Sequence, residues 1–310
     1  MNTPSDALRE SPLESDLVTP AVIPASRRFY WSVRREFWEY RSLYLGPLAV
    51  GALFLLGFLI RTIHLPAQIR AASALNPMQQ QELFEQPYTF AALLFMGVIF
   101  VVSVFYCLDA LHGERRDRSI LFWKSLPVSD LTTVLAKASI PLLILPLLAV
   151  VLTVVTQLLI LLISSVVLLA SGLSVTTLWS HLPLVQMWLM VLFHMVAIHG
   201  LWLAPVYCWM LLVSGWARRA TLLWAVLPPL AIGMAEKIAF NTTHFAAMLG
   251  RRFGAGPEDV PFTTGHMVMA PLTELDLSKF LLSPGLWTGL AVAAVFLAAA
   301  VRLRRYREPM

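Results

Sequence analysis

The sequence predicts an all-α, polytopic membrane protein with six transmembrane helices. Its 310 residues are 58% hydrophobic and only 13% charged, whereas about 25% of the residues of a soluble domain are charged. The apolar residues are gathered into blocks of at least ~20 residues, the length that crosses a bilayer as a helix. Unbroken apolar runs also exclude the alternating pattern of a membrane β-barrel.

Two segments precede the first apolar block. Residues 1–25 are rich in Ser, Pro, Asp and Glu, which predicts a disordered cytoplasmic tail. Residues 26–42 have the period of an amphipathic helix and place aromatic residues beside arginines. This composition is typical of an interfacial helix in contact with membrane lipids. The alternative is a helix packed on a soluble domain, and the sequence offers no such domain.

The predicted transmembrane domain covers residues 43–301, and residues 302–310 form a C-terminal tail. Its six spans are 43–63, 88–111, 139–170, 185–213, 220–240 and 280–301. Pro141, Pro146 and Pro205 lie inside spans and predict kinks. Gly285 and Gly289 form a Gly-x-x-x-Gly motif in the last span, which allows helices to approach closely but is common by chance.

Lysine and arginine positions predict the orientation. With the N-terminus in the cytoplasm, 17 of the 23 Lys and Arg residues fall on the cytoplasmic side. This asymmetry satisfies the positive-inside rule, and an even number of spans places both termini in the cytoplasm. The net charge of +5 is therefore explained by topology, and we expect no nucleic-acid partner.

Little in the chain predicts catalysis. The sequence has no Gly-x-x-x-x-Gly-Lys-Ser/Thr loop, so we expect no nucleotide and no other cofactor on this chain. His194 and His199 project about 140° apart on an α-helix, which argues against a shared metal site. Cys107 and Cys208 both lie in apolar blocks and predict neither a disulfide framework nor a metal cluster. We predict no catalytic residue, no metal ligand and no enzymatic activity.

A few polar residues inside the spans are candidates for a pathway or gate. Glu236 is a carboxylate near the end of the fifth span, and its alternative role is pairing with a nearby cation. Thr153, Thr156 and Gln157 share one face of the third span. These three suit either a pathway wall or helix packing, and packing is the more frequent use.

The connection between spans two and three is the most informative segment. Residues 114–118 form a mixed-charge cluster, and residues 120–123 are four consecutive apolar residues. A solvated loop explains the charges but leaves the apolar residues without cover. Pro127 ends any short helix here, and Ser129 or Asp130 can cap the next one. The segment predicts a short cytoplasmic coupling helix that docks on a partner.

The six spans, the interfacial helix and this connection together resemble the type-2 exporter permeases of the ATP-binding-cassette (ABC) superfamily. Residues 111–130 are similar to the bacterial pattern Glu-Arg-x-x-x-Ser/Thr followed by Leu-Pro-Val/Ile-Ser. The resemblance implies a multi-pass protein of the bacterial inner membrane that forms a homodimer or pairs with another permease. It also implies a separate soluble ATPase subunit that binds ATP and Mg²⁺, because this chain has no fused ATPase domain. By the same resemblance, the residues that couple to the ATPase are Glu114, Arg115, Ser119, Phe122, Trp123, Leu126 and Pro127.

The sequence leaves two other functions open. An integral-membrane protease or lipid-modifying enzyme needs clustered polar residues at one membrane depth, and the sequence shows only scattered ones. A membrane anchor or assembly factor that recruits an ATPase is hard to separate from a permease by sequence. The substrate is left open by the sequence.

Overall fold

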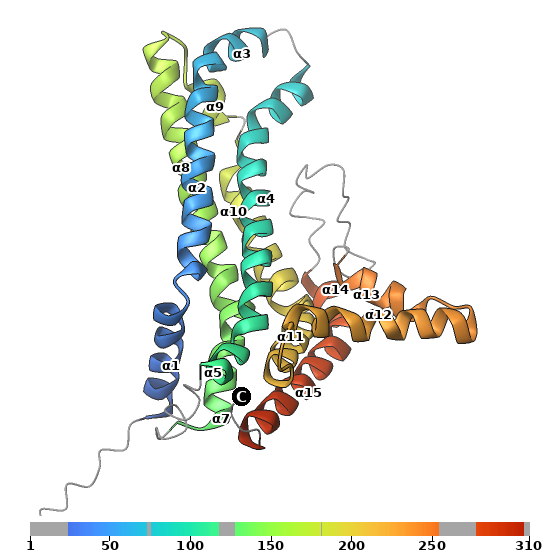
Figure 1. The fold of residues 1–310 in the computed structure, drawn as a ribbon. Coiled ribbons are helices and arrows are strands. Elements are labelled where there is room, and N and C mark those ends of the chain that lie inside the picture. The colour runs from blue at the N-terminus through green and yellow to red at the C-terminus, as the bar shows by residue number, and fades with distance from the viewer. Residues whose placement is uncertain (1–23, 73–75, 118–127, 181, 254–276, 307–310) are drawn as a thin grey trace, which may run out of the picture.

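The computed structural model describes residues 24–72, 76–117, 128–180, 182–253 and 277–306, and every regular element in these ranges is a helix (Figure 1). The first half contains α1 (Ala25–Glu39), α2 (Ser42–Arg61), the 3₁₀-helix η1 (Thr62–His64), α3 (Leu65–Ala72), α4 (Pro77–Asp109), α5 (His112–Arg116), α7 (Asp130–Ser139), the π-helix η2 (Ile140–Ile144) and α8 (Leu145–Ala170). The second half contains α9 (Thr176–Ser180), α10 (Leu184–Phe193), the π-helix η3 (His194–Trp202), α11 (Ala204–Trp216), α12 (Thr221–Phe240), α13 (His244–Phe253), α14 (Leu277–Leu282) and α15 (Pro284–Tyr306).

Six helical segments of the described chain are long and apolar enough to cross a membrane, which confirms the predicted number of candidate spans. They are Ser42–Ala71, Met78–Arg116, Asp130–Ala170, Leu184–Trp202, Thr221–Phe240 and Pro284–Tyr306. The helix of the second candidate span, α4, starts at Pro77, well before the predicted boundary of that span at residue 88. Asn76 has an extended backbone and Pro77 takes the first helical position, where its missing N–H costs no hydrogen bond.

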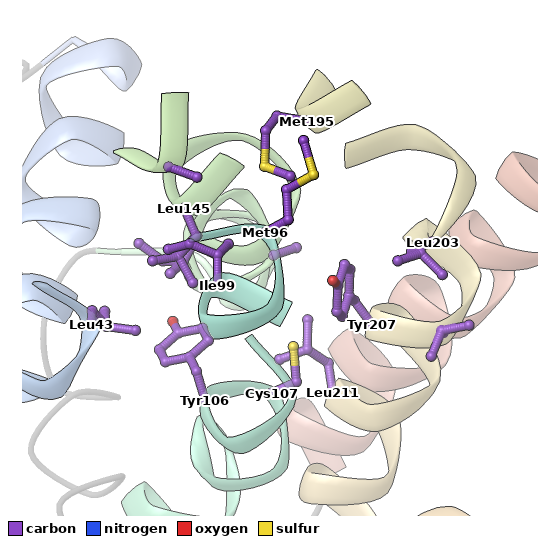
Figure 2. Packing of buried hydrophobic residues seen from close by; sticks show 14 of the residues in the cluster. Leu43, Met96, Ile99, Tyr106, Cys107, Leu145, Met195, Leu203, Tyr207 and Leu211 are labelled. Atoms are coloured by element: carbon purple, nitrogen blue, oxygen red, sulfur yellow. The ribbon is translucent and has the colours of Figure 1, made fainter. Parts of the chain in front are cut away.

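A bundle built around α2, α4 and α8 forms the main body of the protein (Figure 1). Its largest apolar cluster joins Leu43 of α2, Ile99 and Tyr106 of α4, Leu145 of α8 and Tyr207 of α11 (Figure 2). These side chains are almost fully buried. α15 packs along α11, and its C-terminal end lies at the same end of the bundle as α1, α5 and α7 (Figure 1). We call this the basal end.

The predicted fourth span, 185–213, is not one continuous α-helix. It consists of α10, the π-helix η3 and α11, and only Leu184–Trp202 qualifies by itself as a candidate span. The break falls at Leu203, because Pro205 in the first turn of α11 has no N–H to continue the hydrogen-bond pattern. Pro205 was predicted to kink this span, and the structure shows a complete change of helix type there.

The two π-helices, η2 and η3, pack against each other in the interior. Pro141 lies within η2 and Pro146 follows in the first turn of α8, so Pro146 cannot donate an α-helical hydrogen bond to the Leu142 carbonyl. Gly200 of η3 approaches that carbonyl so closely that a Cβ on Gly200 would lie 2.7 Å from the Leu142 oxygen. Only glycine permits this contact without moving the backbone.

The predicted fifth span, 220–240, coincides with α12, but α12 runs sideways from the bundle and is not aligned with α2, α4 and α8 (Figure 1). Ala225 is its only buried residue. The Trp209 indole of α11 donates to the Ala225 carbonyl over 2.9 Å and attaches the helix at its start. Left-handed residues stand at both ends, Ala220 with a φ of 51° and Asn241 with a φ of 53°.

Candidate functional site

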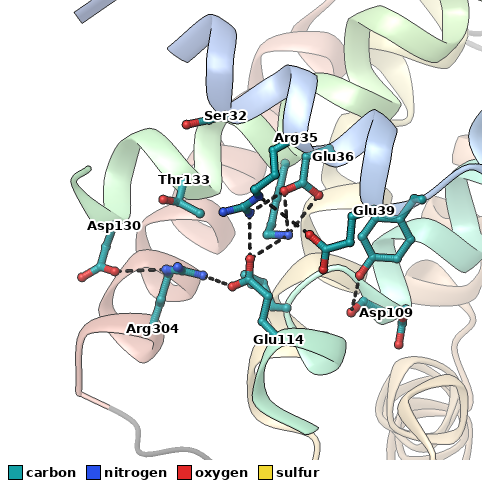
Figure 3. A network of polar contacts seen from close by, with 12 residues as sticks. Ser32, Arg35, Glu36, Glu39, Asp109, Glu114, Asp130, Thr133 and Arg304 are labelled. Atoms are coloured by element: carbon teal, nitrogen blue, oxygen red, sulfur yellow. Dashed lines mark hydrogen bonds and ion pairs between the residues drawn. The ribbon is translucent and has the colours of Figure 1, made fainter. Parts of the chain in front are cut away.

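Charged side chains from four helices meet inside the basal end of the bundle (Figure 3). We call this cluster the basal junction. It consists of Arg35 and Glu36 of α1, Glu114 of α5, Asp130 and Lys137 of α7, and Arg304 of α15. The Glu36 and Lys137 residues are 0% exposed. Charges are buried at such depth only when they are paired, so the junction depends on its ion pairs.

Glu114 lies at the centre of the basal junction. Its Oε1 atom accepts from Arg35 Nη2 over 2.8 Å and lies 3.1 Å from Lys137 Nζ. Its Oε2 atom accepts from Arg304 Nη1. Arg304 in turn donates from Nε to Asp130 Oδ1 over 3.0 Å. One carboxylate therefore ties α5 to α1, α7 and α15 at the same time.

Glu36 is the second buried carboxylate of the basal junction. Both of its oxygens lie 3.0 Å from Lys137 Nζ, and its Oε1 accepts from Arg35 Nη2 over 2.7 Å. The Tyr106 hydroxyl of α4 donates to its Oε2 over 2.9 Å. The face of α1 that carries Arg35 and Glu36 therefore lies against the protein.

The electrostatics of the basal junction favour the charged forms. Burial alone lowers the pKa of the Arg35 guanidinium, but the carboxylates of Glu36 and Glu114 outweigh this effect and raise that pKa above its ordinary value. Burial raises the pKa of Glu39, one turn further along α1, against the opposing charge of Lys137. Glu39 contacts the junction through Arg35, with 3.7 Å between Arg35 Nε and Glu39 Oε2.

Arg115, the neighbour of Glu114, points to a different helix. Its Nη1 donates to the Gly215 carbonyl over 2.8 Å and to the Ala217 carbonyl over 3.4 Å, both at the C-terminus of α11. A cation is favourable there, because the last carbonyls of a helix have no intrahelical partner. The Leu111 N–H adds a hydrogen bond to Ser214 Oγ over 3.3 Å. The second predicted coupling residue therefore connects α5 to α11.

Glu114 and Arg115 are thus buried and make internal contacts. The other predicted coupling residues lie outside the described residues; they are Ser119, Phe122, Trp123, Leu126 and Pro127. Just beyond them, Ser129 takes the N-cap position of α7 and accepts from the Thr132 N–H over 3.1 Å. This confirms the predicted cap and selects Ser129 over Asp130, whose side chain pairs with Arg304.

Glu236, the predicted gate residue, accepts three hydrogen bonds at the start of α13. The donors are the Thr242 hydroxyl and the His244 N–H, each over 2.7 Å, and the Phe245 N–H over 2.8 Å. A carboxylate at a helix N-terminus satisfies orphan N–H groups. These contacts give Glu236 a local role, which is to hold α13 against the end of α12.

The predicted polar face of the third span is buried. Gln157 of α8 donates from Nε2 to the Tyr88 carbonyl over 3.0 Å, and its Oε1 accepts from the Trp188 indole over 2.8 Å. It therefore links α8 to α4 and α10, as the packing interpretation requires. Thr153 and Thr156 are also buried, and no pathway is needed to account for Gln157.

The structure contradicts the assumption that His194 and His199 project about 140° apart on an α-helix. His194 and His199 lie in the π-helix η3, where hydrogen bonds join residues five apart and place them on one face. Their ring centroids are 5.7 Å apart. Within the described ranges, no group of three or more His, Cys, Asp and Glu side chains is arranged to hold a metal ion.

The Gly-x-x-x-Gly motif of α15 accommodates an arginine in this chain. Arg252 of α13 donates from Nη2 to the Gly285 carbonyl over 2.5 Å and from Nη1 to the Trp202 carbonyl over 3.2 Å. Its guanidinium lies 4.1 Å from the centroid of the Trp202 ring. A Cβ on Gly289 would collide with that guanidinium. Gly289 therefore makes room for Arg252 of α13, whereas a Cβ on Gly285 would lie 3.2 Å from the Trp202 ring of η3.

Sequence reasoning missed most of the basal junction. Glu36, Lys137 and Arg304 were not predicted to belong to a site. The signal was present, since Lys137 lies two residues before the predicted third span, and a charge so close to the hydrocarbon core needs a partner. Its partners are far away in the sequence, and a single sequence does not show which charges meet.

Comparisons of the chain with models of known families, with curated proteins and with solved structures gave no match. The function is therefore inferred from the sequence and from the geometry of the basal junction.

Proposed function

We propose that the chain is the membrane permease subunit of an ABC-type exporter, driven by a separate soluble ATPase that binds ATP and Mg²⁺. The observation that carries the proposal is the position of the basal junction. Glu114 and Asp130 lie on the two flanks of residues 118–127, the connection whose sequence pattern suggests docking, and both pair with Arg304. A movement imposed on this connection passes directly to α1, α7 and α15.

The proposed topology places the basal end in the cytoplasm of a bacterium and the six apolar helices in its inner membrane. Both the N-terminal helix α1 and the end of α15 lie at the basal end (Figure 1), which supports cytoplasmic positions for both termini. The exposed side chains of α1 include Tyr30, Trp31 and Trp38, which suit a helix at the membrane surface.

The proposed assembly contains two permease chains, either two copies of this chain or a pair of related chains. α12 supports this part of the proposal, because almost all of its apolar surface is uncovered in the single chain. Apolar side chains on a membrane helix must be covered by lipid or by another helix. A second permease chain provides such a cover.

The proposal is tested by co-purification of the chain with a soluble ATPase. Phe122→Asp should abolish the complex, because it places a charge in the proposed docking segment. The matched control is Trp179→Asp, which changes an exposed aromatic residue of α9, at the end of the bundle opposite the basal end (Figure 1). A complex that survives Phe122→Asp contradicts the docking assignment.

A second measurement separates a permease from an anchor that only recruits the ATPase. The complex is reconstituted in vesicles, and ATP hydrolysis is compared with that of the free ATPase. A permease should change the hydrolysis rate of its partner, because closure of the ATPase is coupled to movement of the spans. An unchanged rate in an intact complex supports the anchor.

A further inference from the structure

A groove lies between α2 and α4, near the end of α2 that is remote from the basal end. It has a volume of about 330 Å³. The lining residues are Phe54, Gly57, Phe58, Arg61, Gln86, Pro87 and Phe90. The groove is therefore apolar except where Arg61 and Gln86 contribute.

Gly57 keeps the groove open. A Cβ on Gly57 would meet no atom within 4 Å, so the missing side chain leaves free space at this position. The rings of Phe54 and Phe90 lie beside it with centroids 5.7 Å apart. An aromatic side chain at position 57 would fill the space that the glycine leaves.

The position of the groove along α2 defines the chemistry of its occupant. The 20 residues of α2 span about 30 Å, the thickness of the hydrocarbon core. Arg61 ends α2 and therefore reaches the headgroup level, whereas Phe54 and Gly57 lie about one to two turns deeper, among acyl chains. A molecule in this groove must be apolar along its length and polar at the end beside Arg61.

Arg61 is well placed to bind an anion. Its Nη2 donates to Gln86 Oε1 over 3.2 Å, and no ion pair of Arg61 occurs within the described part of the chain. A guanidinium with remaining donors matches the geometry of a phosphate. The neighbouring cavity, which Arg61 and Tyr88 line, has a volume of about 30 Å³. That cavity has room for about one water molecule, so the larger groove is the site for an amphiphile.

We propose that the groove between α2 and α4 binds an acyl chain of an anionic phospholipid whose phosphate pairs with Arg61. This site is separate from the basal junction and does not depend on the proposed exporter function. Bound lipid fills the space beside Gly57 and joins α2 to α4 at the end where the basal junction does not reach.

The test uses the full chain in lipid nanodiscs that contain phosphatidylglycerol or phosphatidylcholine with a photoreactive group on the acyl chain. Cross-linked peptides are mapped by mass spectrometry. We expect labelling of the wild type at Phe54 and Phe90, and strong loss of this labelling in Gly57→Phe. The matched control is Gly97→Phe, because Gly97 of α4 also has no atom within 4 Å of a Cβ position but does not line the groove.

The headgroup part of the proposal is tested with Arg61→Gln and Arg61→Lys. Arg61→Gln should lower phosphatidylglycerol labelling about two- to fivefold, the effect of one partly exposed ion pair, and leave phosphatidylcholine labelling unchanged. Arg61→Lys should keep the preference for phosphatidylglycerol. The proposal would be overturned if Gly57→Phe were labelled like the wild type, or if folded Arg61→Gln kept the wild-type level of phosphatidylglycerol labelling.

Discussion

The basal junction and the contact between η2 and η3 hold distant parts of the chain together in opposite ways. The junction joins four helices through buried ion pairs centred on Glu114. The η2–η3 contact joins two spans through the absence of a side chain, at Gly200 against the Leu142 carbonyl. The basal junction depends on charged side chains that must all be present. The η2–η3 contact depends on the absence of a side chain at Gly200.

This difference separates two mechanical roles. A buried ion-pair network fixes orientation, because removal of one member leaves buried charge of the opposite sign uncompensated. A close glycine contact fixes only the distance between two backbone segments. Glycine has no side chain, so the neighbouring groups do not rely on it for a hydrogen bond or an ion pair. The basal junction therefore fixes the orientation of α5 relative to α1, α7 and α15, whereas η2 and η3 set how near the third and fourth predicted spans can come.

The largest effect is expected from Glu114→Ala. Loss of this carboxylate leaves Lys137 and Arg304 with unbalanced buried charge, which should lower the free energy of unfolding by about 3–5 kcal/mol. Thermal unfolding in detergent measures the change. The control is Glu39→Gln: burial raises the pKa of Glu39, so its charged form is already disfavoured and the neutral glutamine should cost little. An equal loss in both variants would contradict the central place of Glu114.

Gly200→Ala tests the second contact. The added methyl group would lie 2.7 Å from a backbone oxygen that cannot rotate away, so we expect a loss of about 1–3 kcal/mol. Gly97→Ala is the matched control, because the same change in open space should be neutral or stabilising through helix propensity. If both variants unfold at the wild-type temperature, η2 and η3 are not in close contact.

Gly289→Ala should have a smaller effect. The group that it displaces is the flexible guanidinium of Arg252, which can swing away at the cost of its contact with Trp202, about 0.5–1 kcal/mol. In an Arg252→Ala background, Gly289→Ala should cost nothing. A double-mutant cycle measures this coupling. Purely additive effects would show that Gly289 does not accommodate Arg252.

The smallest effect is a gain. Ala220 adopts a left-handed conformation that disfavours residues with a Cβ by about 1–2 kcal/mol. Ala220→Gly removes that strain but adds freedom to the unfolded chain, so the unfolding free energy should rise by ~0.5 kcal/mol. Denaturant titration provides the measurement, and a decrease in stability would argue against the left-handed turn before α12.

Hydropathy alone predicted the helical fold and the six candidate spans, because bilayer thickness sets the length of an apolar run. The π-helices were not predicted. Pro141, Pro146 and Pro205 signal an interruption, but whether the chain kinks or changes its hydrogen-bond pattern depends on the packing around Gly200. This is why His194 and His199 were assigned to different faces.

The candidate site was only partly readable from the sequence. Glu114 and Arg115 were singled out through a resemblance, but they were expected to meet a partner, whereas the structure pairs them internally. Glu36, Lys137 and Arg304 lie in three different segments of the chain, so their convergence on Glu114 is a tertiary property. The sequence shows which residues are charged, but it does not show which of them form ion pairs.

The most direct test of the central claim measures coupling in Glu114→Gln, a variant that keeps the shape of the side chain and removes its charge. The variant and the wild type are reconstituted with the partner ATPase, and both binding and permease-dependent ATP hydrolysis are measured. We predict that Glu114→Gln still binds the ATPase through the connection at residues 118–127 but no longer alters its hydrolysis rate. A folded Glu114→Gln variant that binds and couples like the wild type would contradict the account.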